Sequence, residues 1–433
     1  MPPRVNLLSV VFICLLTFWL TNCQSPTQTT SGSGAPGSTS QGTSPSGTTA
    51  SGATSQPVVA LTSSTQAVSA PAFNPVAGTY ASDQLVTISS ATTGAAIHYT
   101  TDGSTPTRLS ALYSAPIAVT GNGTSETIRA IADMSGRTTS SEGSASYVIN
   151  YAWQIFGTIG SGANQLEYPA GVAFDAGGRL YIADQGNSRI VRIDDMSGAT
   201  WTALGSPGGA ENQFKYPAGI AVDAGGQIYV SDSGNNRIIR VKDMKGSGWT
   251  AYGTFGSAAG QLKHPAGVAV DARGRISIAD QGNSRIVQMD DMKGTGWTTF
   301  GKRGSGVGEL KDPAGIVLDP RGRMYIADYA NSRIVRVDDM NGTNWTAFGS
   351  SGSDANHFKY PAGITLDSIG RILVADMIND RVVRIDDMKG ANWTALGGTA
   401  DQFSHPCAVE VDAGGHLCIT DTLNSRIVRL VMP

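Results

Sequence analysis

The sequence predicts an all-β protein built mainly from tandem repeats. The tripeptide Pro-Ala-Gly recurs in steps of 48 residues, beginning at Pro169, Pro217, Pro265, Pro313 and Pro361. A tryptophan recurs with the same step, at Trp153, Trp201, Trp249, Trp297, Trp345 and Trp393. The 433 residues include 54 glycines but only 15% charged residues, which favours tight turns over charged helical surfaces.

Residues 1–22 predict a signal peptide. A short, weakly positive start precedes an apolar run over residues 7–20, which is shorter than the roughly 20 residues of a membrane-spanning helix. The run ends in Leu20-Thr21-Asn22-Cys23, which resembles the lipobox of bacterial lipoproteins. The resemblance implies lipidation of Cys23, although the family prefers Gly, Ala or Ser at the position of Asn22. It also implies a protein anchored in the bacterial cell envelope, with the outer membrane or cell surface favoured by Gln24. Ordinary secretion is the alternative.

Residues 23–70 predict a flexible tether. They are almost entirely Ser, Thr, Gly, Ala, Gln and Pro, and no charged residue occurs between Arg4 and Asp83. Such a composition buries too little apolar surface to offset the entropy lost on ordering the chain. We therefore expect a disordered linker between the anchor and the folded part.

Residues 71–150 predict a small β-sandwich, because short β-rich runs alternate with Gly, Ser and Asp-Gly turns. The segments Gly78-Thr79-Tyr80 and Ile97-His98-Tyr99-Thr100-Thr101-Asp102-Gly103 resemble the C-terminal domain of chitobiase and β-hexosaminidase, an immunoglobulin-like domain. The resemblance implies an accessory module without catalytic residues. We expect it to act as a spacer, and proximity to glycans is the alternative.

Residues 151–433 contain six repeats, and a complete repeat has four short apolar runs, which is the pattern of a β-propeller blade. The sixth repeat ends before its fourth run, whereas residues 153–157 have the fourth-run pattern and precede the first repeat. We expect residues 153–157 to complete the last blade and close the ring, which removes exposed strand edges. The regular spacing of the tryptophans favours packing over ligand stacking.

The motif Ala183-Asp184-x-x-Asn187-Ser188-Arg189-Ile190 has counterparts in all six repeats and resembles the NHL repeat. The resemblance implies a six-bladed propeller and no single function, because the family includes RNA-binding, partner-binding, sensor and enzymatic members. The recurring Asp carboxylates suggest metal or acid–base chemistry at first sight. A structural role is favoured, because Asp and Asn satisfy backbone N–H groups in turns and the Arg can pair with the Asp.

One variable position per repeat is the candidate ligand-binding site. The residue before each repeat proline is expected to lie at one mouth of the central channel, and the six residues are Tyr168, Tyr216, His264, Asp312, Tyr360 and His405. Aromatic rings with polar tips suit a sugar, a peptide or an aromatic ligand. Packing of these side chains against their neighbours is the alternative.

The sequence predicts no catalytic residues, no metal and no cofactor. In a related lyase the metal is held by His placed after the repeat proline, where this chain has Ala170, Ala218, Ala266, Ala314, Ala362 and Cys407. A zinc site built from His264, Asp312 and His405 is disfavoured, because the blades of the two His lie opposite each other. Whether Cys407 and Cys418 form a disulfide or two buried thiols stays open.

Charge argues against nucleic acid as a partner, since 31 Lys and Arg face 34 Asp and Glu and the net charge is −3. The favoured function is a non-catalytic scaffold anchored in the cell envelope. It is expected to be a monomer that touches the membrane only through its lipid and binds a protein, glycan or peptide on the propeller face. The alternative is an extracellular lyase or hydrolase that acts on a polysaccharide or peptide at the channel mouth.

Overall fold

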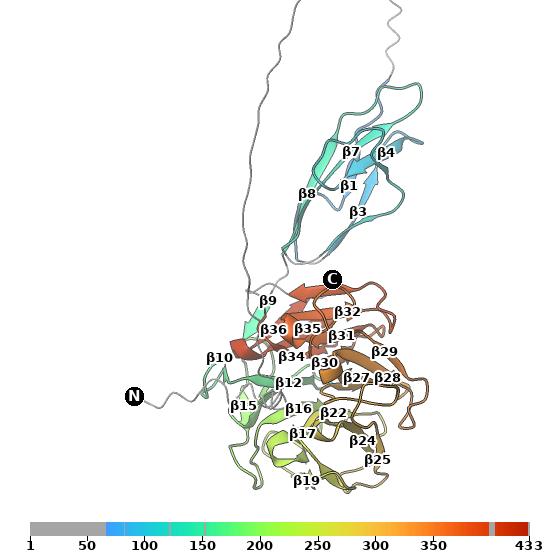
Figure 1. Ribbon diagram of the computed structural model, residues 1–433. Helices are drawn as coiled ribbons and strands as arrows, with labels where there is room; N and C mark the ends of the chain where they lie inside the picture. The colour runs from blue at the N-terminus through green and yellow to red at the C-terminus, as the bar shows by residue number, and fades with distance from the viewer. Residues whose placement is uncertain (1–65, 82, 121–122, 151–152, 398–402, 432–433) are drawn as a thin grey trace, which may run out of the picture.

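The computed structural model describes residues 66–81, 83–120, 123–150, 153–397 and 403–431 (Figure 1). The expected signal peptide, Cys23 and the tether as far as residue 65 lie outside these ranges. Within them the chain is almost entirely β, and its helical elements are five single 3₁₀ turns. None of the helices in the described ranges is long and apolar enough to cross a membrane.

The first domain is a sandwich of two sheets. Three strands form one sheet in the order β1-β3-β6, namely β1 (Ala72–Asn74), β3 (Gln84–Ser89) and β6 (Ile117–Val119). Five strands form the other in the order β2-β8-β7-β4-β5, namely β2 (Gly78–Tyr80), β8 (Gly143–Ile149), β7 (Ser125–Asp133), β4 (Ala96–Thr100) and β5 (Ala111–Leu112). Alternate side chains of β8 are buried, as expected for a strand with one face on a core.

The ordered sandwich extends slightly beyond its expected start at residue 71. Val68 is 3% exposed, and its N–H donates to the carbonyl of Thr138 at 2.9 Å. The last residues of the expected tether therefore pack on the sandwich.

The second domain consists of six four-stranded antiparallel sheets arranged as a ring (Figure 1). Blades one to three are β12 (Pro169–Phe174), β13 (Leu180–Asp184), β14 (Arg189–Ile193), β15 (Thr202–Leu204); β16 (Pro217–Val222), β17 (Ile228–Asp232), β18 (Arg237–Val241), β19 (Thr250–Tyr252); and β22 (Pro265–Val270), β23 (Ile276–Asp280), β24 (Arg285–Met289), β25 (Thr298–Phe300). Blades four to six are β26 (Ile316–Leu318), β27 (Met324–Asp328), β28 (Arg333–Val337), β29 (Thr346–Phe348); β30 (Pro361–Leu366), β31 (Ile372–Asp376), β32 (Arg381–Ile385), β33 (Thr394–Gly397); and β34 (Pro406–Val411), β35 (His416–Asp421), β36 (Arg426–Val431), β9 (Trp153–Phe156).

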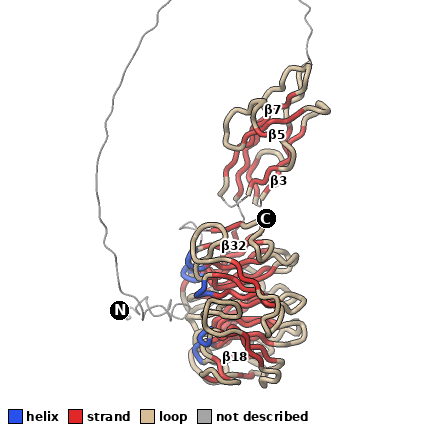
Figure 2. Tube along the Cα trace, turned by 45° about the vertical axis from the view of Figure 1, so that its right-hand side comes forward, coloured by secondary structure: helices blue, strands red, loops and turns tan. Residues whose placement is uncertain are grey.

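Short elements connect these strands. Two small parallel pairs join β10 (Thr158–Ile159) to β11 (Gln165–Leu166) and β20 (Thr254–Phe255) to β21 (Gln261–Leu262). A 3₁₀ turn follows the second strand of blades two to six, at η1 (Ser233–Asn235), η2 (Gln281–Asn283), η3 (Tyr329–Asn331), η4 (Met377–Asn379) and η5 (Thr422–Asn424). Figure 2 shows these turns on one side of the propeller.

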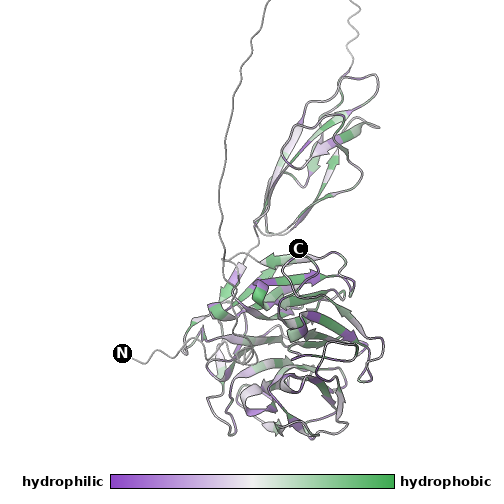
Figure 3. Cartoon of the chain, in the orientation of Figure 1, coloured by the Kyte–Doolittle hydropathy of each residue, from purple (hydrophilic) through white to green (hydrophobic). Residues whose placement is uncertain are grey.

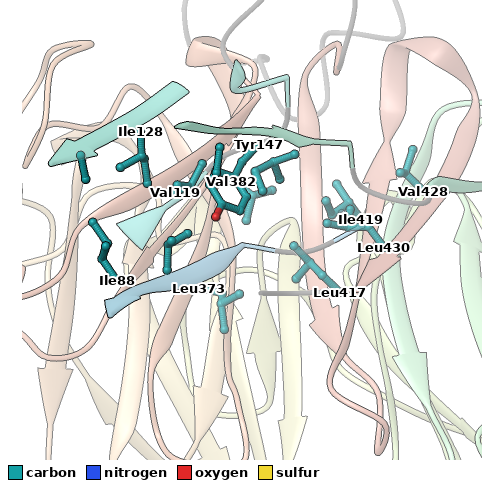
Figure 4. Close-up of a cluster of buried hydrophobic side chains, with 14 of the residues drawn as sticks. Ile88, Val119, Ile128, Tyr147, Leu373, Val382, Leu417, Ile419, Val428 and Leu430 are labelled. Atoms are coloured by element: carbon teal, nitrogen blue, oxygen red, sulfur yellow. The ribbon is translucent and has the colours of Figure 1, made fainter. Parts of the chain in front are cut away.

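The second strands of the blades carry the propeller core. In blades one to five every residue of this strand is buried, including the polar ends Asp184 and Asp232. This is why the runs are continuously apolar, since neighbouring blades cover both faces of each sheet. Figure 3 shows the resulting hydrophobic colour along the blades. One cluster of buried side chains contains residues of the sandwich and of the last two blades, and Figure 4 shows part of it.

Strand β9 completes the last blade, as the tryptophan spacing predicts. It pairs antiparallel with β36, with Phe156 opposite Ile427 and Gln154 opposite Arg429. The guanidinium of Arg429 also donates to the side-chain oxygen of Gln154 at 3.3 Å. The two ends of the repeat array therefore share one sheet, and ring closure is confirmed.

The inner strands approach each other closely at the repeated glycine. A Cβ added at Gly267 of blade three would lie 2.6 Å from the carbonyl oxygen of Ala314 in blade four, and the Gly267 N–H donates to that oxygen at 2.7 Å. Gly171, Gly219 and Gly315 meet the next blade's alanine carbonyl in the same way. Glycine is required here because no side chain fits between the two backbones.

The junction between blades six and one differs. Here Ala408 stands at the glycine position, and its N–H donates to the Thr420 hydroxyl at 2.7 Å. That hydroxyl donates to the carbonyl of Ala170 at 3.4 Å, and the Thr422 hydroxyl donates to the carbonyl of Pro169 at 2.7 Å. The Thr420 hydroxyl therefore bridges the two inner strands where the ring closes, and the Thr422 hydroxyl joins η5 to the inner strand of blade one.

Candidate functional site

The repeated Asp, Asn and Arg form a structural unit in each blade. In blade two the fully buried Asp232 accepts hydrogen bonds from the backbone N–H of Lys215 at 2.7 Å, from the Asn235 amide at 2.8 Å and from Arg237 Nε at 2.7 Å. The other nitrogens of Arg237 donate to the carbonyls of Gly209 at 2.8 Å and Gln213 at 3.0 Å. Both oxygens of the carboxylate accept hydrogen bonds from the framework of the blade, which confirms the structural interpretation.

The tryptophans belong to the same framework. Trp249 lies 5.3 Å from Phe214 between ring centroids, and the guanidinium of Arg237 lies 5.8 Å from the Trp249 ring. The same stacking of Arg on Trp occurs in blades one to five, at Arg189, Arg237, Arg285, Arg333 and Arg381. The rings are therefore held by packing and cation–π contacts between strands.

The six residues before the repeat prolines share one unusual backbone conformation. Their φ angles are positive although none is glycine, between 48° at His264 and 56° at Tyr360. A residue before proline ordinarily adopts extended backbone, and a left-handed conformation costs a non-glycine residue about 1–2 kcal/mol. Hydrogen bonds to the preceding blade hold this conformation. The N–H of His264 donates to Asn236 Oδ1 at 2.9 Å, and that of His405 donates to Asp380 Oδ1 at 2.7 Å.

The strained backbone at these six positions was not predicted from the sequence. The strain recurs in every blade, so the backbone of these positions belongs to the repeat framework, whereas their side chains differ from blade to blade.

Tyr360 is the best-defined of these side chains. Its ring lies 4.9 Å from that of Tyr329 in the preceding blade, and it packs against a cluster that contains Met377, Ala362 and Cys407. Ala362 and Cys407 also line the central channel. Tyr360 therefore lies at the channel mouth, and desolvation of its half-buried hydroxyl raises its pKa.

The three polar positions have different surroundings. Asp312 is 4% exposed and pairs with the Arg303 guanidinium at 2.9 Å. His264 is half-buried, and its pKa is lowered by desolvation and by the neighbouring charge of Lys263. His405 Nδ1 lies 3.5 Å from Asp380 Oδ1. Tyr168 and Tyr216 are half-buried as well. Of the six predicted residues, Asp312 is thus already engaged by a cation of the chain.

The parts of the chain that the structure describes contain no group of three or more His, Cys, Asp or Glu side chains placed to hold a metal ion. Cys407 and Cys418 are both buried thiols, and no disulfide joins them. Cys407 Sγ lies 3.8 Å from Met377 Sδ, and desolvation raises the pKa of Cys418.

A cavity of about 130 Å³ lies in the central channel and is lined by the inner strands of all six blades. Its walls are Ala, Gly, Val, Ile and Cys407, and Glu410 is the one carboxylate among the lining residues. The half-buried Glu410 accepts a hydrogen bond from the Thr365 hydroxyl at 3.1 Å, and desolvation raises its pKa to about 7.

Glu410 was not among the site residues predicted from the sequence. A column-by-column comparison of the repeats contains the signal, because the equivalent residues are Ala173, Ala221, Ala269, Val317 and Thr365.

Comparisons with known proteins agree with this architecture. Residues 75–144 match the chitobiase/beta-hexosaminidase C-terminal domain, and residues 166–193 and 214–240 match the NHL repeat. A comparison with curated proteins found no match. The chain therefore carries a chitobiase C-terminal-like domain followed by an NHL-repeat β-propeller.

Several solved structures are similar. A protein of unknown function from Bacteroides thetaiotaomicron has a TM-score of 0.50 at 16% identity, covering 84% of this chain and 98% of its own. Virginiamycin B lyase from Staphylococcus aureus has a TM-score of 0.46 at 16% identity, covering 65% and 99%. A gluconolactonase from Xanthomonas campestris has a TM-score of 0.47 at 18% identity, covering 62% and 87%. At these identities the likeness concerns the fold alone.

Proposed function

The chain carries an NHL-repeat propeller behind a chitobiase C-terminal-like domain, and we propose that it is a non-catalytic binding scaffold. In this proposal it recognises a protein, glycan or peptide at one mouth of the central channel. The observation that carries the proposal is the contrast at the residues before the repeat prolines. The backbone of these six residues has the same strained conformation in every blade, yet their side chains are Tyr, His or Asp. The fold dictates where these side chains stand, and the difference between blades supports a role in recognition.

Tyr and His side chains suit this role. They combine an apolar ring with a polar tip, and few rotatable bonds are immobilised when they bind. The ring of Tyr360, which packs at a tilt against the buried Tyr329, offers an aromatic surface beside the channel. Asp312 and its partner Arg303 add a charged pair to the ring.

The second candidate is a lyase or hydrolase acting on a polysaccharide or peptide at the same mouth. One observation favours it: the Glu410 carboxyl has a pKa of about 7, which is the range of a general acid or base at neutral pH. Turnover of array-identified ligands by the wild-type protein, lost in Glu410→Gln, would establish the enzyme.

The mouth is tested with Tyr216→Ala and Tyr360→Ala. Ligands are first identified on glycan and peptide arrays, and affinities are then measured by calorimetry. We expect each substitution to weaken binding about tenfold or more, because an aromatic anchor contributes ~1–3 kcal/mol. Trp249→Ala is the matched control and should lower the melting temperature further than either Tyr substitution, since Trp249 packs within the blade. Unchanged affinity in both Tyr variants, together with a loss of stability equal to that of the Trp variant, would show that the ring is packing.

For localisation, we propose that the protein is exported and held in the bacterial envelope by a lipid on Cys23, with the sandwich acting as a spacer. Cys23→Ser should move the protein from the membrane fraction to the soluble fraction, because acyl chains supply the membrane affinity. Fractionation followed by immunoblotting measures the change. Cys14→Ser, within the expected signal peptide, is the matched control and should leave the distribution unaltered. Retention of the Cys23 variant in the membrane fraction would exclude the lipid anchor.

A further inference from the structure

Glu410 is a departure from the repeat that the fold does not require. Five blades have Ala, Val or Thr at this inner-strand position, and they build the same sheet. A carboxylate in an apolar channel costs free energy through desolvation unless a proton or a cation compensates it.

The surroundings of Glu410 supply hydrogen bonds from the Thr365 hydroxyl and the Val411 backbone but no cation. Its Oε1 accepts from the hydroxyl of Thr365, a residue that is 1% exposed. Among the described residues no Lys, Arg or His forms an ion pair with Glu410, and the nearby Arg429 is paired with Asp412. The carboxylate is thus positioned by neutral donors, and its charge is left for another partner.

The cavity beside Glu410 has the shape and lining for an apolar stem. It extends along β34 from Cys407, next to the mouth, to Glu410, and its walls include the small side chains of Ala170, Ala218 and Ala266. At about 130 Å³ it is close in size to apolar protein cavities that admit benzene. Ala362 and Cys407 belong both to this cavity and to the cluster around Tyr360, so the cavity adjoins the proposed mouth site.

We propose that the channel receives an alkylammonium group, the chemistry of a lysine side chain, with its ammonium against Glu410 and its methylenes against the alanine walls. The inference rests on the proposed binding function, because it specifies a lysine-bearing peptide as the ligand. An unbranched stem fits this lining of small apolar side chains better than the hydroxyl-rich ring of an amino sugar, for which the walls offer few polar side chains.

The test uses the purified full chain and isothermal titration calorimetry at pH 8. Pentylammonium chloride is compared with pentanol, which has the same stem without the charge, and with glucosamine. We expect pentylammonium to bind at least tenfold more tightly than either compound, since a charge-assisted contact is replaced in pentanol by a neutral one. Shortening the stem from pentyl to propyl should weaken binding about fourfold per methylene. This comparison needs no variant and stands whatever the stability of the mutants.

Two substitutions then locate the site. Glu410→Gln keeps the shape of the side chain and should weaken pentylammonium binding at least tenfold, whereas Glu211→Gln, an exposed carboxylate in an outer loop, should have no effect. Equal binding of pentanol and pentylammonium, an unaltered affinity in Glu410→Gln, or no binding to the wild type would overturn the proposal. Preference for glucosamine would overturn the lysine assignment. Loss of binding in Glu410→Gln, together with array ligands unaffected by Tyr216→Ala and Tyr360→Ala, would uphold the channel site and reject the mouth site.

Discussion

Deleting Trp153–Phe156 is expected to lower the melting temperature of the propeller by about 10 °C or more and to cause aggregation. The deletion removes the outer strand of the last blade, including the buried Phe156 and the packing of Trp153 on Phe403 at 5.2 Å. Loss of one large buried side chain alone costs ~3–5 kcal/mol, and a kcal/mol corresponds to about 2–4 °C in a domain of this size. The freed edge of β36 is also a template for strand pairing between molecules.

A relocated strand provides the control. The same four residues can be placed after the C-terminus behind a copy of residues 386–392, the loop that precedes the fourth strand of blade five. This chain restores the sheet with a different connection and should regain most of the melting temperature in differential scanning calorimetry. Equal melting of the shortened and parent chains would contradict a stabilising role for closure by β9.

Asp232→Ala is expected to cost about 3–5 kcal/mol of unfolding free energy, the second large effect. The substitution leaves the Arg237 side chain, which is 15% exposed, without its carboxylate. It also removes the acceptor of the Lys215 N–H and one of the two acceptors of the Asn235 amide. Removing one partner of a buried ion pair is costly because the other charge remains buried. Urea denaturation followed by tryptophan fluorescence measures the loss.

Asp243→Ala is the matched control for this substitution. Asp243 accepts hydrogen bonds from the N–H groups of Lys245 and Ser247, but both of these residues are exposed and Asp243 forms no ion pair with a buried cation among the described residues. Its removal should cost much less unfolding free energy than the removal of Asp232, because surface substitutions usually have small effects. Similar losses in the two variants would refute the assignment of the buried Asp to the framework.

Periodicity made the ring predictable from the sequence. Each blade is one repeat, so the phase of Trp153 relative to Pro169 was sufficient to predict which strand completes the sixth sheet. The strand register within a hairpin was harder to predict from the sequence. In the last blade the structure pairs Cys418 with Glu410, because the hydrogen bond from Asp412 N–H to the carbonyl of His416 closes the turn and sets the register.

The candidate site was predictable only in part. The residues before the prolines stand out because they vary within a constant repeat, but their left-handed backbone depends on hydrogen bonds to the preceding blade. The repeat position of Glu410 varies as well, and the candidate role of Glu410 depends on a cavity formed by all six inner strands. A property that requires the whole ring cannot be read from one repeat, since the distance between blades is set by the glycine contacts and not by local pattern.

The junction between blades six and one also determines when the ring of blades can close during synthesis of the chain. Strand β9 emerges before any blade, yet its partner β36 (Arg426–Val431) is made after five complete blades, and Gln154 and Arg429 are 275 residues apart in the chain. The hydroxyls of Thr420 and Thr422, which donate to the inner strand of blade one, arrive equally late. A partly synthesised chain therefore carries β9 as an unpaired strand and an open array of blades, and long-range pairing of this kind is slow to form. Factors that shield β9 until β36 is made will raise the yield of closed propeller.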